Sequence, residues 1–546
     1  MNDVCYVAYD RGDYEEYKIK PGMTLDRIGK ELFSDSICAV MDGVLVSLAE
    51  EVKAGARINF LSPKTNQQAS RVFLRGATFL LYCASRALMP ERELIVDYAL
   101  YGGIFCRIPN ITKDEISALE KKIYEYIASD KDFTLTIMPV SDAKKIMLDE
   151  GLAAKAALLA YRPFDYYRMY EFDGQKNYFH GIMPKSSGYL DGVRLKAYSN
   201  GFILTYPTPY TESATPITNQ PKYSRVFEEA EEWARVLGAS YVAGINDMFR
   251  NGNFADFIDV NEALHEKTIA GIAQKVADRE GVRVVLIAGP SSSGKTTFAG
   301  RLAVHLRAIG KKCRPISVDD YYKNREDIPY DENGKRDFET IEALDVEKLN
   351  EDLNKLLACE VAHMPRYDFV TGERKPEAVP MCIDSDILII EGIHGLNDAL
   401  TKSIPHDMKF KIFVSPLTTL NIDEHNVVFP DDLRLIRRLT RDIRTRGFSF
   451  EQTFSVWDSV RRGEYKYILP YQETADEMFN STLFYEPLVL KKHCYSELLK
   501  FKPDMQYYPE AQSLLKFLNY VLSFDDESVI PVKSILREFI GPLKIN

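Results

Sequence analysis

The sequence contains no uninterrupted apolar run of 18 residues, so it offers no segment that would span a membrane as a helix. Its first residues, MNDVCYVAYDRGD, carry charge early and do not resemble a secretory signal peptide. Both absences lead us to expect a cytoplasmic protein with no membrane partner.

Paired cysteines and an excess of positive charge are also missing. The eight cysteines are scattered and form no C-x-x-C pair, which favours reduced core thiols over disulfides or zinc ligands. The 69 Lys and Arg residues are outnumbered by 80 Asp and Glu, and the formal net charge is −11. This balance argues against broad electrostatic binding to nucleic acid, but it does not exclude a local basic face. At 546 residues the chain exceeds one ordinary core, so we expect several domains.

One stretch, VVLIAGPSSSGKTT, carries a recognisable chemical motif. Val284 to Ala288 predict a buried strand, Gly289 to Thr296 fit G-x-x-x-x-G-K-[ST], and Phe298 to Ile309 predict a helix. Backbone N–H groups of such a loop bind polyphosphate, its lysine neutralises phosphate charge, and its hydroxyl binds Mg²⁺. The predicted nucleotide-binding residues are Gly289, Pro290, Ser291, Ser292, Ser293, Gly294, Lys295, Thr296 and Thr297.

Two acidic residues follow predicted strands downstream of this loop. The strand Pro315 to Val318 ends at Asp319, where a carboxylate could accept the proton of an attacking hydroxyl. Asp320 is the second choice for this base, and a turn aspartate is the structural alternative. The strand Ile387 to Ile390 runs into Glu391, which we predict to hold Mg²⁺ together with Thr296.

An arginine-rich helix is predicted from Leu433 to Thr445. Between Asp431 and Gly447 six arginines outnumber three aspartates. Such a stripe is usually a solvated face. We favour a mobile lid instead, in which Arg438 and Arg441 offset the charge of the transferring phosphoryl group.

Six motifs in register now support a resemblance: GPSSSGKTT, SVDDYYK, RDFETIEALD, PRYDFVTGERK, ILIIEG and RLIRRLTRDIRTRG. They are similar to the uridine kinase and phosphoribulokinase family over about residues 282–490. The resemblance implies a P-loop kinase with a parallel sheet that uses ATP and Mg²⁺ to phosphorylate a small-molecule hydroxyl, typically the 5′-hydroxyl of uridine or cytidine. It implies Asp319 as base, with Lys295, Arg438 and Arg441 also catalytic. The substrate-binding residues we assign are Asp320, Tyr321, Glu339, Tyr367 and Arg446.

Departures from the family pattern concern the acceptor. The ribose-contacting aspartate of the family becomes Glu339, whereas Tyr367 is retained. Three polar contacts with the base are replaced by Gly372, Phe448 and Val456. A site built on hydrogen bonds derives much of its discrimination from those groups. We therefore expect intact catalytic machinery and a rebuilt base pocket.

The amino-terminal half resembles parts of threonyl-tRNA synthetase. Residues 1–64 resemble a TGS domain, a β-grasp module, with turns at Pro21-Gly22 and Asp42-Gly43 and a helix from about Thr24. Residues 65–208 resemble the second additional domain, an α+β fold shared with alanyl-tRNA editing domains. Editing domains bind zinc through four residues, whose positions are taken here by side chains that ligate zinc poorly: Arg75, Phe79, Tyr178 and Ile182. A structural or regulatory role is therefore favoured over hydrolytic editing.

The remaining segments complete an α/β protein with five parts. Residues 209–280 are a linker and helical connector, with a helix from Ser224 to Leu237 and a second one capped by Asp259 and Glu262. Residues 281–490 are the kinase, and residues 491–546 form a helical tail expected to dock on it.

Three functions stay open at this point. The first is a nucleoside kinase, and the second is the same chemistry on a non-nucleoside polyol. The third is an RNA- or ribosome-associated regulator in which the synthetase-like half binds RNA and the P-loop half is an ATP-gated switch. The sequence leaves open whether the chain forms oligomers.

Overall fold

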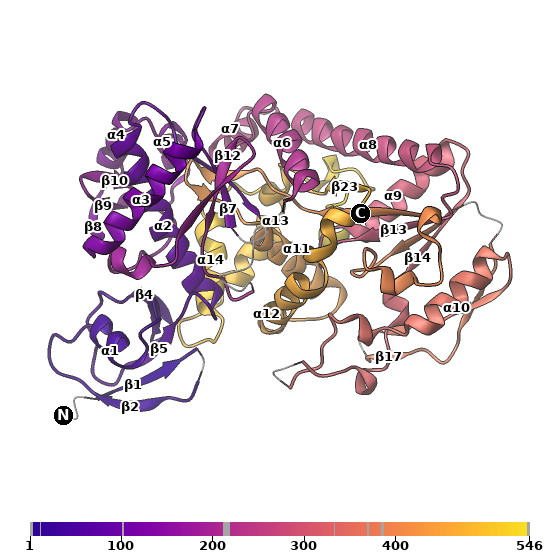
Figure 1. Cartoon of the computed structure of the whole chain (residues 1–546), viewed down its shortest axis with the longest axis horizontal. Helices are drawn as coiled ribbons and strands as arrows, with labels where there is room; N and C mark the ends of the chain where they lie inside the picture. Colours follow the sequence, from indigo (N-terminus) through magenta and orange to yellow (C-terminus); the bar gives the residue numbers. More distant parts are fainter. Residues whose placement is uncertain are drawn as a thin grey trace.

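The computed structural model describes residues 4–10, 12–100, 103–210, 219–331, 334–368, 371–383 and 387–542. Two amino-terminal units lie beside a larger unit built on a parallel sheet, and a long helix runs along the top of the molecule (Figure 1). Within the described ranges, none of the helices combines the length and apolar character that a membrane crossing requires.

The first unit is a five-stranded sheet in the order β2-β1-β5-β3-β4. Strands β1 and β5 pair in parallel, and the other pairs are antiparallel. Asp42 and Gly43 have positive φ, as the tight β3–β4 turn requires. The elements are β1 (Val4–Tyr9), β2 (Glu15–Lys18), α1 (Leu25–Leu32), β3 (Cys38–Met41), β4 (Val44–Ser47) and β5 (Arg57–Leu61).

The second unit is organised around the long helix α2 (Gln67–Leu88), whose side chains are mostly buried. Four strands form an antiparallel sheet in the order β11-β12-β7-β6, and three more form the sheet β10-β9-β8. Its remaining elements are β6 (Ile95–Leu100), β7 (Gly103–Arg107), α3 (Lys113–Ser129), β8 (Thr134–Pro139), α4 (Val140–Asp149), α5 (Ala153–Leu158), β9 (Tyr166–Phe172), β10 (Gln175–Asn177), β11 (Arg194–Tyr198) and β12 (Gly201–Thr205).

Three helices connect this unit to the parallel sheet: α6 (Pro221–Val236), α7 (Val242–Arg250) and α8 (Phe254–Asp278). Most of the predicted linker, residues 211–218, lies outside the described residues. The predicted start of the second helix was wrong. Helix α8 begins at Phe254, and Asp259 lies inside it, because Phe254, Phe257 and Ile258 are buried and extend its apolar face towards the amino terminus.

The larger unit contains a five-stranded sheet in the order β14-β19-β13-β20-β23, with every pairing parallel. Along β13, Val285 and Ile287 pack with α8 and α9, whereas Val284 and Leu286 pack with α10 on the other face. Helices on both faces are the reason that the strand is apolar throughout. The strands are β13 (Val284–Ala288), β14 (Cys313–Ser317), β19 (Ile387–Glu391), β20 (Lys409–Ser415) and β23 (Glu477–Asn480).

Helices and small hairpins complete this unit. The helices are α9 (Lys295–Ala308), α10 (Val346–Leu357), α11 (Pro430–Thr445), α12 (Phe450–Tyr467), α13 (Glu486–Leu498), α14 (Tyr508–Leu518) and α15 (Arg537–Ile540). The hairpins pair β15 (Ala362–Met364) with β18 (Val379–Met381), β16 (Tyr367–Asp368) with β17 (Glu373–Arg374), and β21 (Asn421–Asp423) with β22 (Asn426–Val427). The tail docks on the kinase unit as predicted: Ile535, Leu536 and Phe539 belong to its core.

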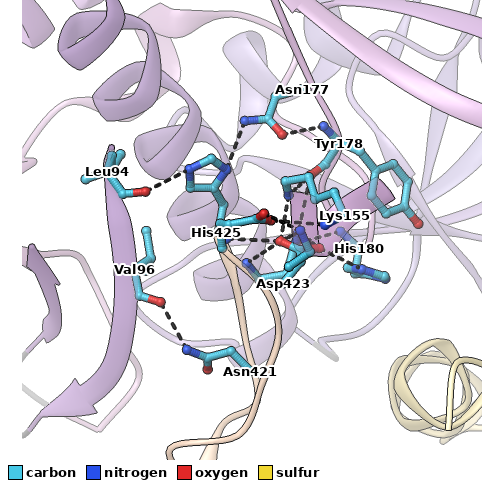
Figure 2. A network of polar contacts seen from close by, with 12 residues as sticks. Leu94, Val96, Lys155, Asn177, Tyr178, His180, Asn421, Asp423 and His425 are labelled. Carbon is cyan, nitrogen blue, oxygen red and sulfur yellow. Dashed lines mark hydrogen bonds and ion pairs between the residues drawn. The ribbon is translucent and has the colours of Figure 1, made fainter. Parts of the chain in front are cut away.

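The β21–β22 hairpin joins the larger unit to the second unit through a buried polar network (Figure 2). Lys155 Nζ lies 2.7 Å from the Asp423 carboxylate, and both side chains are fully buried. His425 contacts Asn177 at 3.1 Å. The ammonium of Lys155 and the ring of His180 hold the pKa of Asp423 well below its usual range despite burial, so this carboxylate stays ionised. The second unit therefore contributes the cation of this buried pair, and the larger unit contributes the carboxylate.

Replacing Lys155 by methionine is expected to destabilise the protein by about 3–5 kcal/mol, because it leaves the Asp423 carboxylate buried without its cation. Thermal unfolding measures the effect as a lower midpoint. Lys144→Met, on the exposed face of α4, is the matched control and should unfold like the wild type. Equal midpoints for both variants would show that the buried pair does not hold the units together.

Candidate active site

Residues 289–297 follow β13 and form the phosphate loop, which is called the cradle below. Its closest backbone contacts leave room only for glycine. Gly289 has φ +158°, and a Cβ there would lie 1.9 Å from the carbonyl oxygen of Val414. Gly294 has φ +86° and is the N-cap residue directly before α9. The hydroxyls of Ser292 and Ser293 are buried and make no hydrogen bond to the described residues. A helix amino terminus with unpartnered donors fits the oxygens of a polyphosphate.

Lys295 and Glu391 lie at the end of this cradle. Lys295 Nζ donates to the carbonyl oxygen of Pro290 at 3.1 Å. The Glu391 carboxylate accepts from Ser317 at 2.9 Å and from Thr296 at 3.3 Å. Burial lowers the pKa of Lys295, with Glu391 and Asp319 acting in the opposite direction. A carboxylate beside a threonine hydroxyl is an oxygen donor pair that suits Mg²⁺.

Asp319 and Asp320 occupy a single 3₁₀ turn after β14, but they face different partners. Burial raises the pKa of Asp319, and the positive charge of Lys295 opposes this effect. The Asp319 carboxylate therefore interacts electrostatically with the lysine of the phosphate loop. Asp320 instead accepts from Arg366 at 2.8 Å and from the backbone N–H of Tyr367 at 3.4 Å. Asp320 is therefore engaged by Arg366 and Tyr367, whereas Asp319 is the carboxylate that interacts electrostatically with Lys295.

Helix α11 brings arginines to the loop. Arg438 donates to the Ser291 hydroxyl at 2.9 Å and lies 3.2 Å from Asp442. The same carboxylate lies 2.8 Å from Arg441 and 3.7 Å from Arg446. One aspartate thus orients three cations beside the phosphate loop.

The arginines of α11 are not a solvated face, and the mobile lid stays a prediction. Arg434 forms an ion pair with Glu464, and Arg437 lies 2.6 Å from Glu486, with all four side chains buried. Since α11 is anchored by buried ion pairs on α12 and α13, its arginines are fixed beside the loop in this structure.

The predicted acceptor residues divide into two groups. Burial raises the pKa of Glu339 to about 7, while Arg438 acts in the opposite direction. Tyr367 is buried next to Tyr322, with ring centroids 5.6 Å apart. Tyr321 does not join them: its side chain is fully buried and its hydroxyl donates to Asp352 at 3.1 Å. The Tyr321 hydroxyl is therefore bonded to a core residue and is not directed at a substrate.

Glu538 in the tail is a residue of this site that no sequence motif indicates. Its carboxylate accepts from the Thr297 hydroxyl at 2.9 Å and from the Thr297 backbone N–H at 3.3 Å. A Cβ at Gly294 would lie 2.6 Å from Ile535 of the same segment. No local signal marks this residue, because the contact joins positions 241 residues apart. The tail thus brings a carboxylate to the first turn of α9, where anions are stabilised.

The parallel sheet, the phosphate cradle and the carboxylates at the strand ends define the class of this protein, which is a P-loop small-molecule kinase. The model of the phosphoribulokinase/uridine kinase family matches residues 284–483. The chain belongs to that family through its carboxyl-terminal part.

Two relatives illustrate the relationship. A uridine kinase of Ligilactobacillus salivarius (strain UCC118) is 31% identical over 203 residues, which cover 37% of this chain and 86% of the relative. A uridine kinase of Borrelia hermsii (strain HS1 / DAH) is 31% identical over 196 residues, or 36% of this chain and 84% of the relative. A solved structure described as a possible uridine kinase from Bacillus stearothermophilus is 21% identical, covers 39% of this chain and 96% of its own, and has a TM-score of 0.25, too low to support an argument.

Proposed function

We propose that the protein transfers the γ-phosphoryl group of ATP to the hydroxyl of a nucleoside-like small molecule. The observation that carries this proposal is the cradle at residues 289–297, in which the Ser292 and Ser293 hydroxyls make no hydrogen bond to the described residues. Beside it, the charges of Lys295 and Asp319 interact with each other. A kinase needs these two features together: donors for a polyphosphate, and a base for the attacking hydroxyl.

Each residue has a distinct role in this proposal. Thr296 and Glu391 hold Mg²⁺, which when bound offsets phosphate charge. Lys295 neutralises the phosphates, and Asp319 accepts the hydroxyl proton. Arg438 and Arg441, held by Asp442, stabilise negative charge that develops during transfer.

The acceptor pocket supports a second candidate, a non-nucleoside acceptor that carries negative charge. Gly372 stands where the family pattern has a histidine for the pyrimidine. A Cβ at Gly372 would lie 2.7 Å from Arg325 Nε, so the guanidinium of Arg325 lies against this glycine. Burial raises the pKa of the neighbouring Tyr367, and Arg325 opposes that effect. A cation beside the acceptor residues suits an anionic polyol better than a neutral pyrimidine.

A screen of the purified full chain with ATP and Mg²⁺ tests both candidates. Nucleosides, neutral sugars and acidic or phosphorylated sugars are offered separately, and ADP formation and the phosphorylated product are measured. Turnover of uridine or cytidine supports the first candidate, and turnover confined to acidic polyols supports the second. ADP formation that depends on RNA instead would favour the ATP-gated regulator.

The contact of Glu538 with Thr297 carries a prediction about nucleotide affinity. A carboxylate on the first turn of α9 competes with phosphate oxygens for the same N–H and hydroxyl donors. Glu538→Gln is therefore expected to lower KM for ATP about fivefold, which corresponds to about 1 kcal/mol at a helix amino terminus. Lys533→Gln, on the exposed part of the same segment, is the control. An unchanged or higher KM for Glu538→Gln would contradict this competition.

For the amino-terminal half we propose a TGS-like β-grasp module at residues 1–64 and a synthetase-editing-like domain at residues 65–208, followed by the connector (209–280), the kinase (281–490) and the tail (491–546). The mixed sheet with its parallel β1–β5 pair supports the first assignment. Of the four residues aligned with zinc ligands, Phe79 and Tyr178 are buried in the core and Arg75 donates to the carbonyl oxygen of Ile182 at 2.9 Å. These side chains support a structural or regulatory role rather than zinc-dependent hydrolysis.

A further inference from the structure

A cavity of about 80 Å³ lies where three parts of the chain meet. One wall is α2 of the second unit, the second is the β21–β22 hairpin with the start of α11, and the third is α14 of the tail. Figure 1 shows α14 between α2 and α11. This junction cavity is separate from the phosphate loop, none of whose residues line it.

The charged groups that line the junction cavity are unbalanced. Arg71 is neutralised by Asp432, with Nη–Oδ distances of 2.5 and 2.8 Å. Arg75 and Lys516 have no carboxylate partner among the described residues: Arg75 bonds only through Nε to the carbonyl oxygen of Ile182, and Lys516 makes no hydrogen bond or ion pair. Two cations therefore face the cavity without a counter-charge.

The local backbone is shaped to hold the guanidinium of Arg75 in place. Gly181 has φ +148°, and a Cβ there would lie 2.6 Å from Arg75 Cζ. Neither Nη group of Arg75 donates a hydrogen bond to a described residue. Burial lowers the pKa of Arg75 to about 10, and the charge of Arg71 acts in the same direction.

His180 also lines the junction cavity, and one of its two ring nitrogens has no partner within the described residues. Its side chain is 7% exposed, and neither ring nitrogen makes a hydrogen bond within the described residues. Nε2 lies 3.6 Å from Asp423, beyond hydrogen-bond distance, and that carboxylate is already paired with Lys155. A buried imidazole nitrogen normally has a hydrogen-bond partner, and Nδ1 is the nitrogen that a ligand in the cavity would satisfy.

We propose that the junction cavity binds the phosphate group of a small molecule between Arg75 and Lys516, with His180 as a further hydrogen-bonding group. A guanidinium fork matches phosphate oxygens in a planar, bidentate way, and an ammonium adds a point charge. Asp432, which fixes Arg71 in the same cavity, lies in the first turn of α11. Arg434 and Arg438 of this helix contact Ser291 of the phosphate loop. The site thus adjoins the helix that supports the phosphate loop.

Isothermal titration of the full chain tests the proposal. Lys295→Ala serves as the background, so that the phosphate loop is weakened, and inorganic phosphate, ribose 5-phosphate and succinate are titrated separately. We expect the two phosphate probes to bind and succinate to bind more weakly. Adding Lys516→Gln or Arg75→Gln should weaken phosphate binding at least about tenfold, as for the loss of one charge-assisted hydrogen bond. Lys145→Gln, on the exposed face of α4, is the matched control.

Three results would overturn the proposal: no binding of either phosphate probe, tighter binding of succinate, or unchanged phosphate affinity in Lys516→Gln. Lys516 is solvent-exposed at the cavity, so its glutamine variant is expected to fold even where Arg75→Gln does not. Thermal unfolding of each variant establishes that the protein measured is folded. Since the background lacks Lys295, the outcome does not depend on the kinase proposal.

Discussion

Replacing Asp319 by asparagine is expected to lower kcat by about 10²–10⁴-fold, the usual contribution of a positioned general base. An amide is nearly isosteric with the carboxylate but cannot accept the hydroxyl proton. Asp319 lies near Lys295, whose charge opposes the upward shift of the Asp319 pKa caused by burial. The variant should therefore fold and bind ATP while turnover falls, which steady-state kinetics on the true acceptor would measure.

Asp320→Asn is the matched control because it changes the next residue in the same turn. Its carboxylate accepts from Arg366 and from the backbone of Tyr367, so its loss should affect the acceptor KM more than kcat. If Asp320→Asn abolished turnover while Asp319→Asn kept near wild-type kcat, the base would have to be Asp320.

Removing the Lys295 side chain is expected to lower kcat by about 10²–10³-fold, comparable to the loss of one preorganised donor to developing charge. Lys295→Ala leaves Glu391 and Asp319 without the cation that counters their mutual repulsion in the ligand-free site. It also removes the contact with the carbonyl oxygen of Pro290. Kinetics at saturating ATP separate this loss of turnover from weaker nucleotide binding.

Lys311→Ala removes a lysine just beyond the opposite end of α9 and should leave kcat unchanged. A similar loss in both variants would indicate that charge on α9 as a whole, rather than an ammonium at the cradle, supports turnover. Near wild-type kcat in Lys295→Ala would contradict the role assigned to this lysine.

Local features of the sequence predicted the centre of the kinase unit well. Val284–Ala288 was predicted with the observed bounds because a strand buried on both faces is apolar at every position. The helix after the loop was predicted to start at Phe298 but begins at Lys295, since the phosphate-loop lysine already lies in its first turn. The helices predicted from Ser224 and Leu433 begin three residues earlier, each with a proline in the first turn.

Long-range contacts could not be predicted in this way. An arginine stripe such as that of α11 is typical of a solvated face, but Glu464 and Glu486, which neutralise Arg434 and Arg437, lie 30 and 49 residues away in sequence. Tyr321 is a predicted substrate-binding residue, but its hydroxyl donates to Asp352 of α10, which lies 31 residues further along the chain. Glu538 and the junction cavity likewise depend on which distant segments the fold brings together.

A crystal structure of the full chain with Mg²⁺ and a non-hydrolysable ATP analogue tests the central claim most directly. We expect the triphosphate in the cradle at residues 289–297, Mg²⁺ bound near Thr296 and Glu391, the Glu538 carboxylate displaced from Thr297, and Asp319 directed at the terminal phosphate. A nucleotide bound elsewhere, or Asp319 turned away from the terminal phosphate, would contradict this account.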